Sequence, residues 1–196
     1  MRRAITGVLT AALLLAGIVA VRRATPDADA KYAPIASVGE MGEQVNTAAF
    51  QLRVDRVQLA RSVRLEDAYG LLGQPKSTAG VWVVVWATVA ATTEEVTVQG
   101  ARLRTADGAE YLASSVSGTL DKTALAPGMP SYGPILFEVP PGRLAGAALE
   151  VTVHSVKSLD HLGPAAAVDL RLSGPYTKAL IEQAPASLTV GPVRDL

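Results

Sequence analysis

Few residues in this 196-residue chain could do chemistry, and their spacing brings none of them into a known catalytic arrangement. His154 and His161 are the only histidines, too few for a multi-histidine metal centre. Asp160 precedes His161, but neighbouring side chains on an extended backbone point apart, so we interpret both as loop residues. His154 falls on the outward phase of an expected strand, where solvent exposure explains it. We therefore expect no catalytic residues and no enzymatic activity.

Metal and cofactor chemistry also lack the residues that they need. The chain has no cysteine, which excludes disulfides, thiolate zinc sites and cysteine nucleophiles. The acidic pairs Glu66-Asp67 and Glu94-Glu95 could attract calcium, but a calcium site needs about six to eight oxygen ligands and no DxDxDG loop gathers them. The sequence also has no GxxxxGKS/T or GxSxG motif. We expect no metal and no cofactor, and we interpret the acidic pairs as solvated loop residues.

The most informative pair is Trp82 and Trp86, in the segment VWVVVWATV. Residues four apart share one face of a strand, so the two indoles lie together while the alternating valines form the opposite face. The pair could be an aromatic platform for a sugar, but filling a core is the interpretation that we favour. Because a sandwich strand buries only one face against the other sheet, the tryptophan face needs its own cover. Trp82 and Trp86 are thus a possible ligand or partner face, covered by the C-terminal segment, by residues 61–78 or by another protein.

The charge distribution separates the N-terminus from the rest of the chain. The chain carries 18 basic and 18 acidic residues and has a net charge of zero. Four arginines flank one N-terminal apolar run, so the remaining chain is more acidic than basic. Such a body lacks the basic footprint that neutralises phosphates, and we expect no nucleic acid partner.

The N-terminal apolar run has the length of a membrane span. Residues 4–21 form 18 positions without a charge, between Arg2-Arg3 and Arg22-Arg23. At about 1.5 Å per residue, such a helix spans about 27 Å, close to a hydrocarbon core of about 30 Å. The run therefore predicts an N-terminal transmembrane helix within residues 1–23. The alternative is a cleaved signal peptide, for which Ala28-Asp29-Ala30 is the better cleavage site.

A retained anchor implies a location for the rest of the chain. The short head with two arginines stays inside and the acidic body is translocated, which predicts a single-pass cell-membrane protein with its C-terminal domain outside the cytoplasm. The partners we expect are the membrane, through the N-terminal helix, and an unknown envelope protein. A cleaved segment would instead leave a secreted protein that binds a carbohydrate or a lipid.

Alternating apolar and polar residues after the anchor predict an all-β domain. We expect a linker over residues 24–37, a β-sandwich over 38–175, and a C-terminal extension over 176–196 with a possible short helix. A phase slip between Val54 and Val57 predicts a bulge at Asp55-Arg56. Residues 61–78 have no consistent period and read as a long loop. The strand signals lie at residues 50–54, 57–59, 81–89, 96–98, 101–105, 110–112, 135–139, 149–153 and 168–172.

One known order of motifs is matched by VGEMGEQVNTAAFQLRVDRVQ, VWVVVWATVAATTEEV, ARLRTADGAEYLAS and LAPGMPSYGPILFEVPPGRLAGAALEVTV. Together they resemble the telokin-like, immunoglobulin-like domain of unknown function found on exported proteins of Gram-positive, actinobacterial-type bacteria. The L-x-P-G turn and the F-x-V-P strand end match at residues 125–128 and 137–140, and the hairpin at residues 107–111 has Asp107-Gly108 where the family has D-x-G. The resemblance covers residues 38–153, although Ala90-Ala91-Thr92 stands where the family commonly has an asparagine.

The resemblance implies an immunoglobulin-like antiparallel β-sandwich in an exported protein, and it implies no catalytic residue. Combined with the apolar run, it predicts a membrane-anchored extracytoplasmic module that binds or interacts with an unknown ligand.

Overall fold

The computed structural model describes residues 14–19, 21–22, 34–154 and 163–196. The chain divides into two compact units, Met1–Ala33 and Pro34–Leu196. In the first unit, residues 14–19 and 21–22 are helical. Among the described residues, no helix has the length and apolar character to cross a membrane. Most of the anchor predicted over residues 1–23 lies outside the described residues, so the anchor stays a prediction.

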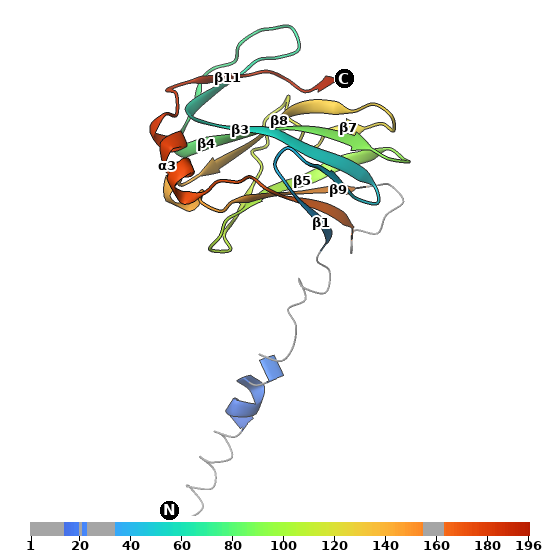
Figure 1. Ribbon diagram of the computed structural model, residues 1–196, viewed down its shortest axis with the longest axis vertical. Coiled ribbons are helices and arrows are strands. Elements are labelled where there is room, and N and C mark those ends of the chain that lie inside the picture. Colours follow the sequence, from blue (N-terminus) through green and yellow to red (C-terminus); the bar gives the residue numbers. More distant parts are fainter. Residues whose placement is uncertain (1–13, 20, 23–33, 155–162) are drawn as a thin grey trace, which may run out of the picture. The chain divides into compact units, whose positions relative to one another are not determined.

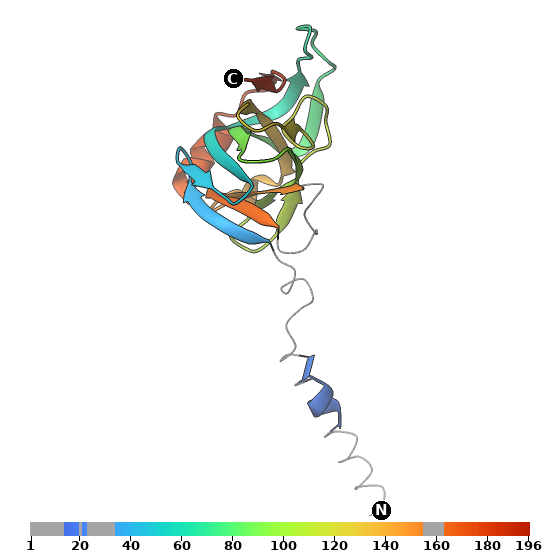
Figure 2. The same cartoon turned by 90° about the vertical axis from the view of Figure 1, so that its right-hand side faces the viewer.

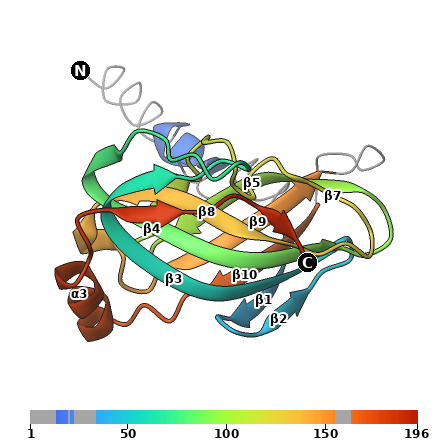
Figure 3. The ribbon, with the colours of Figure 1, turned by 90° about the horizontal axis from the view of Figure 1, so that it is seen from above.

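The second unit is a sandwich of two β-sheets (Figures 1 and 3). Sheet A has the strand order β1-β10-β9-β5-β6, with β7 also paired to β5. Its strands are β1 (Ile35–Glu40), β5 (Val96–Arg104), β6 (Glu110–Leu112), β7 (Ala124–Leu125), β9 (Ala148–His154) and β10 (Pro164–Asp169). Sheet B has the order β11-β3-β4-β8-β12, with β2 also paired to β3. Its strands are β2 (Gln44–Asn46), β3 (Phe50–Leu65), β4 (Lys76–Ala91), β8 (Ser131–Val139), β11 (Leu188–Val190) and β12 (Arg194–Asp195). The predicted all-β sandwich is therefore confirmed.

Pairing between neighbouring strands is antiparallel except at two places. β1 pairs with β10 in parallel, and β11 pairs with β3 in parallel. Both exceptions lie at a sheet edge, where a segment distant in sequence joins the sheet. The sequence predicted only antiparallel strands, because periodicity carries no information about the direction of a neighbour.

β4 is the central strand of sheet B, as its apolar sequence predicted. It lies between β3 and β8, and Val81, Val83 and Val85 are buried in the core between the two sheets. The bulge predicted at Asp55-Arg56 is present, since the register of β3 against β4 shifts between Val54 and Arg56. This extra residue allows Val54 and Leu59 to face the same core.

The long loop predicted over residues 61–78 is wrong at both of its ends. β3 continues to Leu65 and β4 begins at Lys76, so the connection is a ten-residue hairpin loop. A second register shift between Ala60 and Ser62 explains the missing alternation, because it turns the later residues of β3 to the other face.

The predicted boundaries of the domain differ from those of the sheets. The expected start at residue 38 falls inside β1, which begins at Ile35. The helices of the described sandwich unit are the 3-10 turn η1 (Pro141–Arg143), between β8 and β9, and α3 (Gly174–Glu182), near the C-terminal end. The helix predicted in the C-terminal extension is present, but residues 188–190 and 194–195 pair with β3 and β8. Residues 176–196 thus form part of the sandwich.

Candidate functional site

The outer face of sheet B, which carries the tryptophan pair, is covered by a second apolar core. Trp82 is only 2% exposed and Trp86 only 7% exposed. They belong to a set of buried residues that we call the outer cluster: Ala60, Val63, Trp82, Val84, Trp86, Leu136 and Val190. The burial agrees with the core interpretation of the pair. A sugar platform would need open ring faces, and neither indole offers one.

The cover of the outer cluster comes from three parts of the chain. Leu188 lies in the C-terminal segment and Leu65 lies at the end of β3, and both pack against the cluster. Val116, in the connection between β6 and β7, also packs there. That connection follows β8, because Ser114 N–H donates to the Leu136 carbonyl at 2.7 Å and Leu120 N–H donates to the Pro134 carbonyl at 2.9 Å. The sequence named the first two covers and missed the third.

A stack of four side chains, which includes Trp86 of the outer cluster, crosses sheet B. The rings of Trp86 and Tyr132 lie 5.6 Å apart at 17°. The Arg56 guanidinium lies 4.8 Å from the Trp86 ring centre, and the Arg194 guanidinium lies 5.1 Å from the Tyr132 ring centre. The strand order β3-β4-β8-β12 places these groups in sequence across the sheet. The aromatic faces are therefore occupied by cations, which is a stabilising arrangement.

Both indole N–H groups have partners. Trp82 Nε1 donates to the Lys76 carbonyl at 2.9 Å, and Trp86 Nε1 donates to Gln58 Oε1 at 2.8 Å. A buried indole usually finds such an acceptor. The bond from Trp82 also connects the outer cluster to the first residue of β4, next to the hairpin loop.

A cleft of about 790 Å³ lies between this hairpin loop and the segments at residues 117–123 and 192–193. We call it the β3–β4 cleft. Its volume is within the range of about 300 to 1,000 Å³ that is typical of ligand sites. Its apolar lining residues are Leu65, Ala68, Leu71, Leu72, Pro192 and Val193. Its charged lining residues are Glu66, Asp67 and Lys76.

The hairpin loop exposes large apolar side chains. Tyr69 is 90% exposed, Leu71 68% and Leu72 52%. Figure 1 shows this loop at one end of the sandwich unit, with the C-terminal segment that contains β11 beside it. Apolar side chains gathered on one tip are typical of a surface that binds another molecule.

Hydrogen bonds hold the loop in this conformation. Asp67 Oδ1 accepts from Tyr69 N–H at 2.9 Å and from Leu71 N–H at 2.8 Å. Gly70 has a φ of +81°, a left-handed conformation that favours glycine. Gly73 N–H donates to the Leu65 carbonyl at 2.8 Å and closes the loop. Asp67, which we interpreted as a solvated loop residue, therefore has a definite role in shaping the turn.

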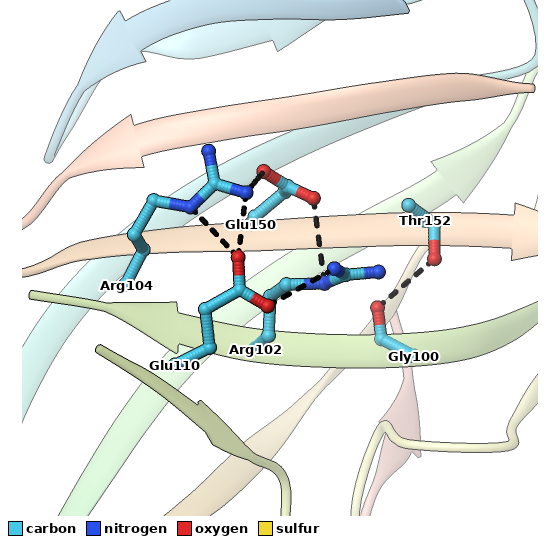
Figure 4. Close-up of polar contacts among 6 residues, drawn as sticks. All are labelled: Gly100, Arg102, Arg104, Glu110, Glu150 and Thr152. Atoms are coloured by element: carbon cyan, nitrogen blue, oxygen red, sulfur yellow. Dashed lines mark hydrogen bonds and ion pairs between the residues drawn. The ribbon is translucent and has the colours of Figure 1, made fainter. Parts of the chain in front are cut away.

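A network of charges lies on the outer face of sheet A (Figure 4). Arg104 Nη2 lies 2.8 Å from Glu110 Oε1 and 3.4 Å from Glu150 Oε2. Arg102 contacts the same two carboxylates, at 3.3 Å and 3.4 Å. A hydrogen bond from Arg104, followed by the charge of Arg102, lowers the pKa of Glu110. The network joins β5, β6 and β9, and each of its charges is paired with an opposite charge. We therefore interpret the network as a stabilising contact between strands and not as a binding site.

The expected absence of catalytic residues, of a metal and of a cofactor remains untested. His161 and Asp160 lie outside the described residues, and His154 ends β9. Within the described part of the chain, no group of three or more histidine or acidic side chains could hold a metal ion. The expectation of no enzymatic activity stays a prediction.

Comparison with known proteins identifies no family. No family model matches the chain, and no curated protein matches it. One similar solved structure is an uncharacterised β-sandwich protein from Clostridium difficile 630, with a TM-score of 0.46 and 10% identity over 70% of this chain and 96% of the other. Another is MPT63, a secreted protein from Mycobacterium tuberculosis, with a TM-score of 0.45 and 22% identity over 69% of this chain and 97% of the other. The fold assignment depends on the two paired sheets, and the telokin-like resemblance stays a prediction.

Proposed function

We propose that this chain is a membrane-anchored, extracytoplasmic module of immunoglobulin-like type that binds an apolar peptide segment of an envelope protein in the β3–β4 cleft. The observation that carries the proposal is the exposure of Tyr69, Leu71 and Leu72 beside that cleft. The proposal includes no catalytic step.

The exposed tip favours a protein partner. Leaving large apolar side chains in water forgoes about 1.5 to 3 kcal/mol for each side chain that could be buried. The turn made by Asp67 and Gly70 holds them outward, so the loop is already ordered before binding. A preorganised tip loses little conformational entropy on association, and tyrosine is enriched where proteins bind most tightly.

The charges around the cleft suggest the composition of the peptide. Glu66 and Asp67 line the cleft together with Lys76, so acidic groups outnumber basic ones there. A peptide with aliphatic or aromatic residues and a neighbouring lysine or arginine would match both the apolar lining and this charge.

The location outside the cytoplasm is supported by the sequence. The apolar run between two arginine pairs has the length of a membrane span, and the body is acidic and free of cysteine. The alternative of a secreted carbohydrate or lipid binder predicts an exposed platform of Trp82 and Trp86, and both rings are buried.

Selection from a random peptide library on the purified full-length chain tests the proposal. We expect the selected peptides to be apolar with a basic residue, and to bind the variant Leu72→Ser at least about tenfold more weakly than the wild type. Met129→Ser is the matched control, because Met129 and Leu72 are both 52% exposed. Equal binding to both variants, or a failure to select any peptide, would contradict the proposal.

A further inference from the structure

β1 is an open edge of sheet A in the described structure. It pairs only with β10, and Figure 2 shows it in blue at the rim of the sandwich unit. Ile35 N–H donates to the Gly163 carbonyl at 3.0 Å, and Met41 N–H donates to the Asp169 carbonyl at 2.9 Å. Alternation along a strand then directs the backbone groups of Ala36 and Val38 to the open side. This edge offers two donors and two acceptors to a further strand.

The other edge strands of the two sheets are short or carry charge, and both features hinder pairing with a further strand. β1 is longer, and its first five residues carry no charge. β6 and β11 have three residues each, and β12 consists of Arg194 and Asp195. β1 has six residues with the sequence IASVGE. Its only charged residue, Glu40, is paired with Arg171, whose Nε donates to Glu40 Oε2 at 2.8 Å. Short length, charge and proline are the features that normally prevent edge strands from pairing.

Apolar side chains are exposed on the same edge. Val38 is 79% exposed and Ile35 is 68% exposed. A strand added beside β1 would remove part of both side chains from water, in addition to pairing the backbone.

We propose that β1 pairs with β1 of a second copy of this chain, antiparallel about a two-fold axis at Ser37. In this register Ala36 faces Val38 of the second copy, and Val38 faces Ala36 of the second copy. Each open N–H donor then meets an open carbonyl acceptor of the second copy. The two identical strands therefore complete each other's backbone hydrogen bonds, and no other protein is needed. Glu40 lies opposite Pro34 of the second copy, so no like charges meet. The small residues at 36, 37 and 39 allow the close approach.

The absence of cysteine makes a disulfide test specific. In the proposed register, residue 37 faces its own copy at a non-hydrogen-bonded position, where Cα atoms lie about 4.5 Å apart, within the reach of a disulfide. Full-length Ser37→Cys in membranes should form a disulfide dimer under a mild oxidant. Ala36→Cys is the control, because residue 36 faces residue 38 and not itself, and it should form at least about tenfold less dimer.

A second variant separates pairing from folding. Val38→Pro removes one open donor and no existing bond to β10. It should reduce the dimer fraction in sedimentation of the full-length chain in detergent at least about tenfold, with an unchanged free energy of unfolding. Equal disulfide formation at positions 36 and 37, or a wild-type chain that sediments as a monomer, would overturn the proposal, as would pairing of this edge with a different protein. The result is independent of the β3–β4 cleft, because its residues are not altered.

Discussion

Trp86 stacks on Tyr132 across strands β4 and β8, with ring centres 5.6 Å apart and ring planes at 17°. The pair connects the buried outer cluster to the edge of sheet B, where β12 supplies Arg194 over the Tyr132 ring. The C-terminal residues are thereby attached to the centre of the sheet through aromatic contacts as well as through backbone pairing.

This relationship predicts the effect of removing the indole. Trp86→Ala should lower the free energy of unfolding by about 3 to 5 kcal/mol, because it deletes a buried aromatic side chain and its contact with Tyr132. Urea denaturation followed by circular dichroism measures the change. Tyr69→Ala is the control and should change stability by less than about 0.5 kcal/mol, since Tyr69 is 90% exposed. A similar loss in both variants would contradict the account of the outer cluster.

The C-terminal segment lies close against β8 at Gly133. A Cβ atom at this position would lie 2.7 Å from Val193 Cγ2 and 3.1 Å from Val193 Cα. Gly133→Ala should therefore lower the free energy of unfolding by about 1 to 3 kcal/mol through overpacking. Gly142→Ala is the matched control, because a Cβ there meets nothing within 4 Å. Chemical denaturation of both variants measures the difference, and an unchanged Gly133→Ala would show that the segment packs elsewhere.

The charge network predicts a dependence of stability on pH. The pKa of Glu110 is lowered from its ordinary value of 4.5, chiefly by the hydrogen bond from Arg104. A lowered folded-state pKa stabilises the fold above the unfolded-state pKa, and this contribution is lost as the pH falls through the lowered value. Glu110→Gln should thus be less stable than the wild type at neutral pH, with a difference that shrinks below pH 4.5. A difference that stays constant across this range would exclude Glu110 as the titrating group.

The N-terminal segment makes a prediction about the mature chain. Because residues 4–21 have the length and apolar character of a span, we expect full-length protein in the membrane fraction of a Gram-positive host. Intact mass of the membrane fraction and of the medium measures the N-terminus in each. A chain that begins after Ala20 or Ala30 in the medium would show cleavage and would favour a secreted binder.

Two of the predicted features with a clear period were correct, whereas the alternation at residues 168–172 predicted a strand that in fact ends with β10 at Asp169. The apolar alternation of β4 and the phase slip at Asp55 both follow from the two-residue repeat of a strand, which the sequence displays directly. The second bulge, between Ala60 and Ser62, disrupted that repeat and made the end of β3 look like a loop. Local patterns thus succeed only while the register is regular.

Long-range packing could not be predicted in the same way. Nothing in the residues around Val116 indicates that they follow β8 and cover the tryptophans, because this depends on a partner distant in sequence. Leu71 and Leu72 were visible beside two glycines, but their exposure depends on the turn formed by Asp67. The tryptophan pair could be located from sequence, whereas the β3–β4 cleft required the fold.

Photo-crosslinking tests the central claim, that the β3–β4 cleft binds an apolar peptide, most directly. A photoreactive amino acid replaces Leu72 in one full-length variant and Met129 in another, two positions of equal exposure. Each variant is irradiated with a library-selected peptide, and mass spectrometry identifies the linked residues. We predict a covalent product at position 72 and at most a trace at position 129. Equal products at the two positions, or a product at position 129 alone, would contradict the claim.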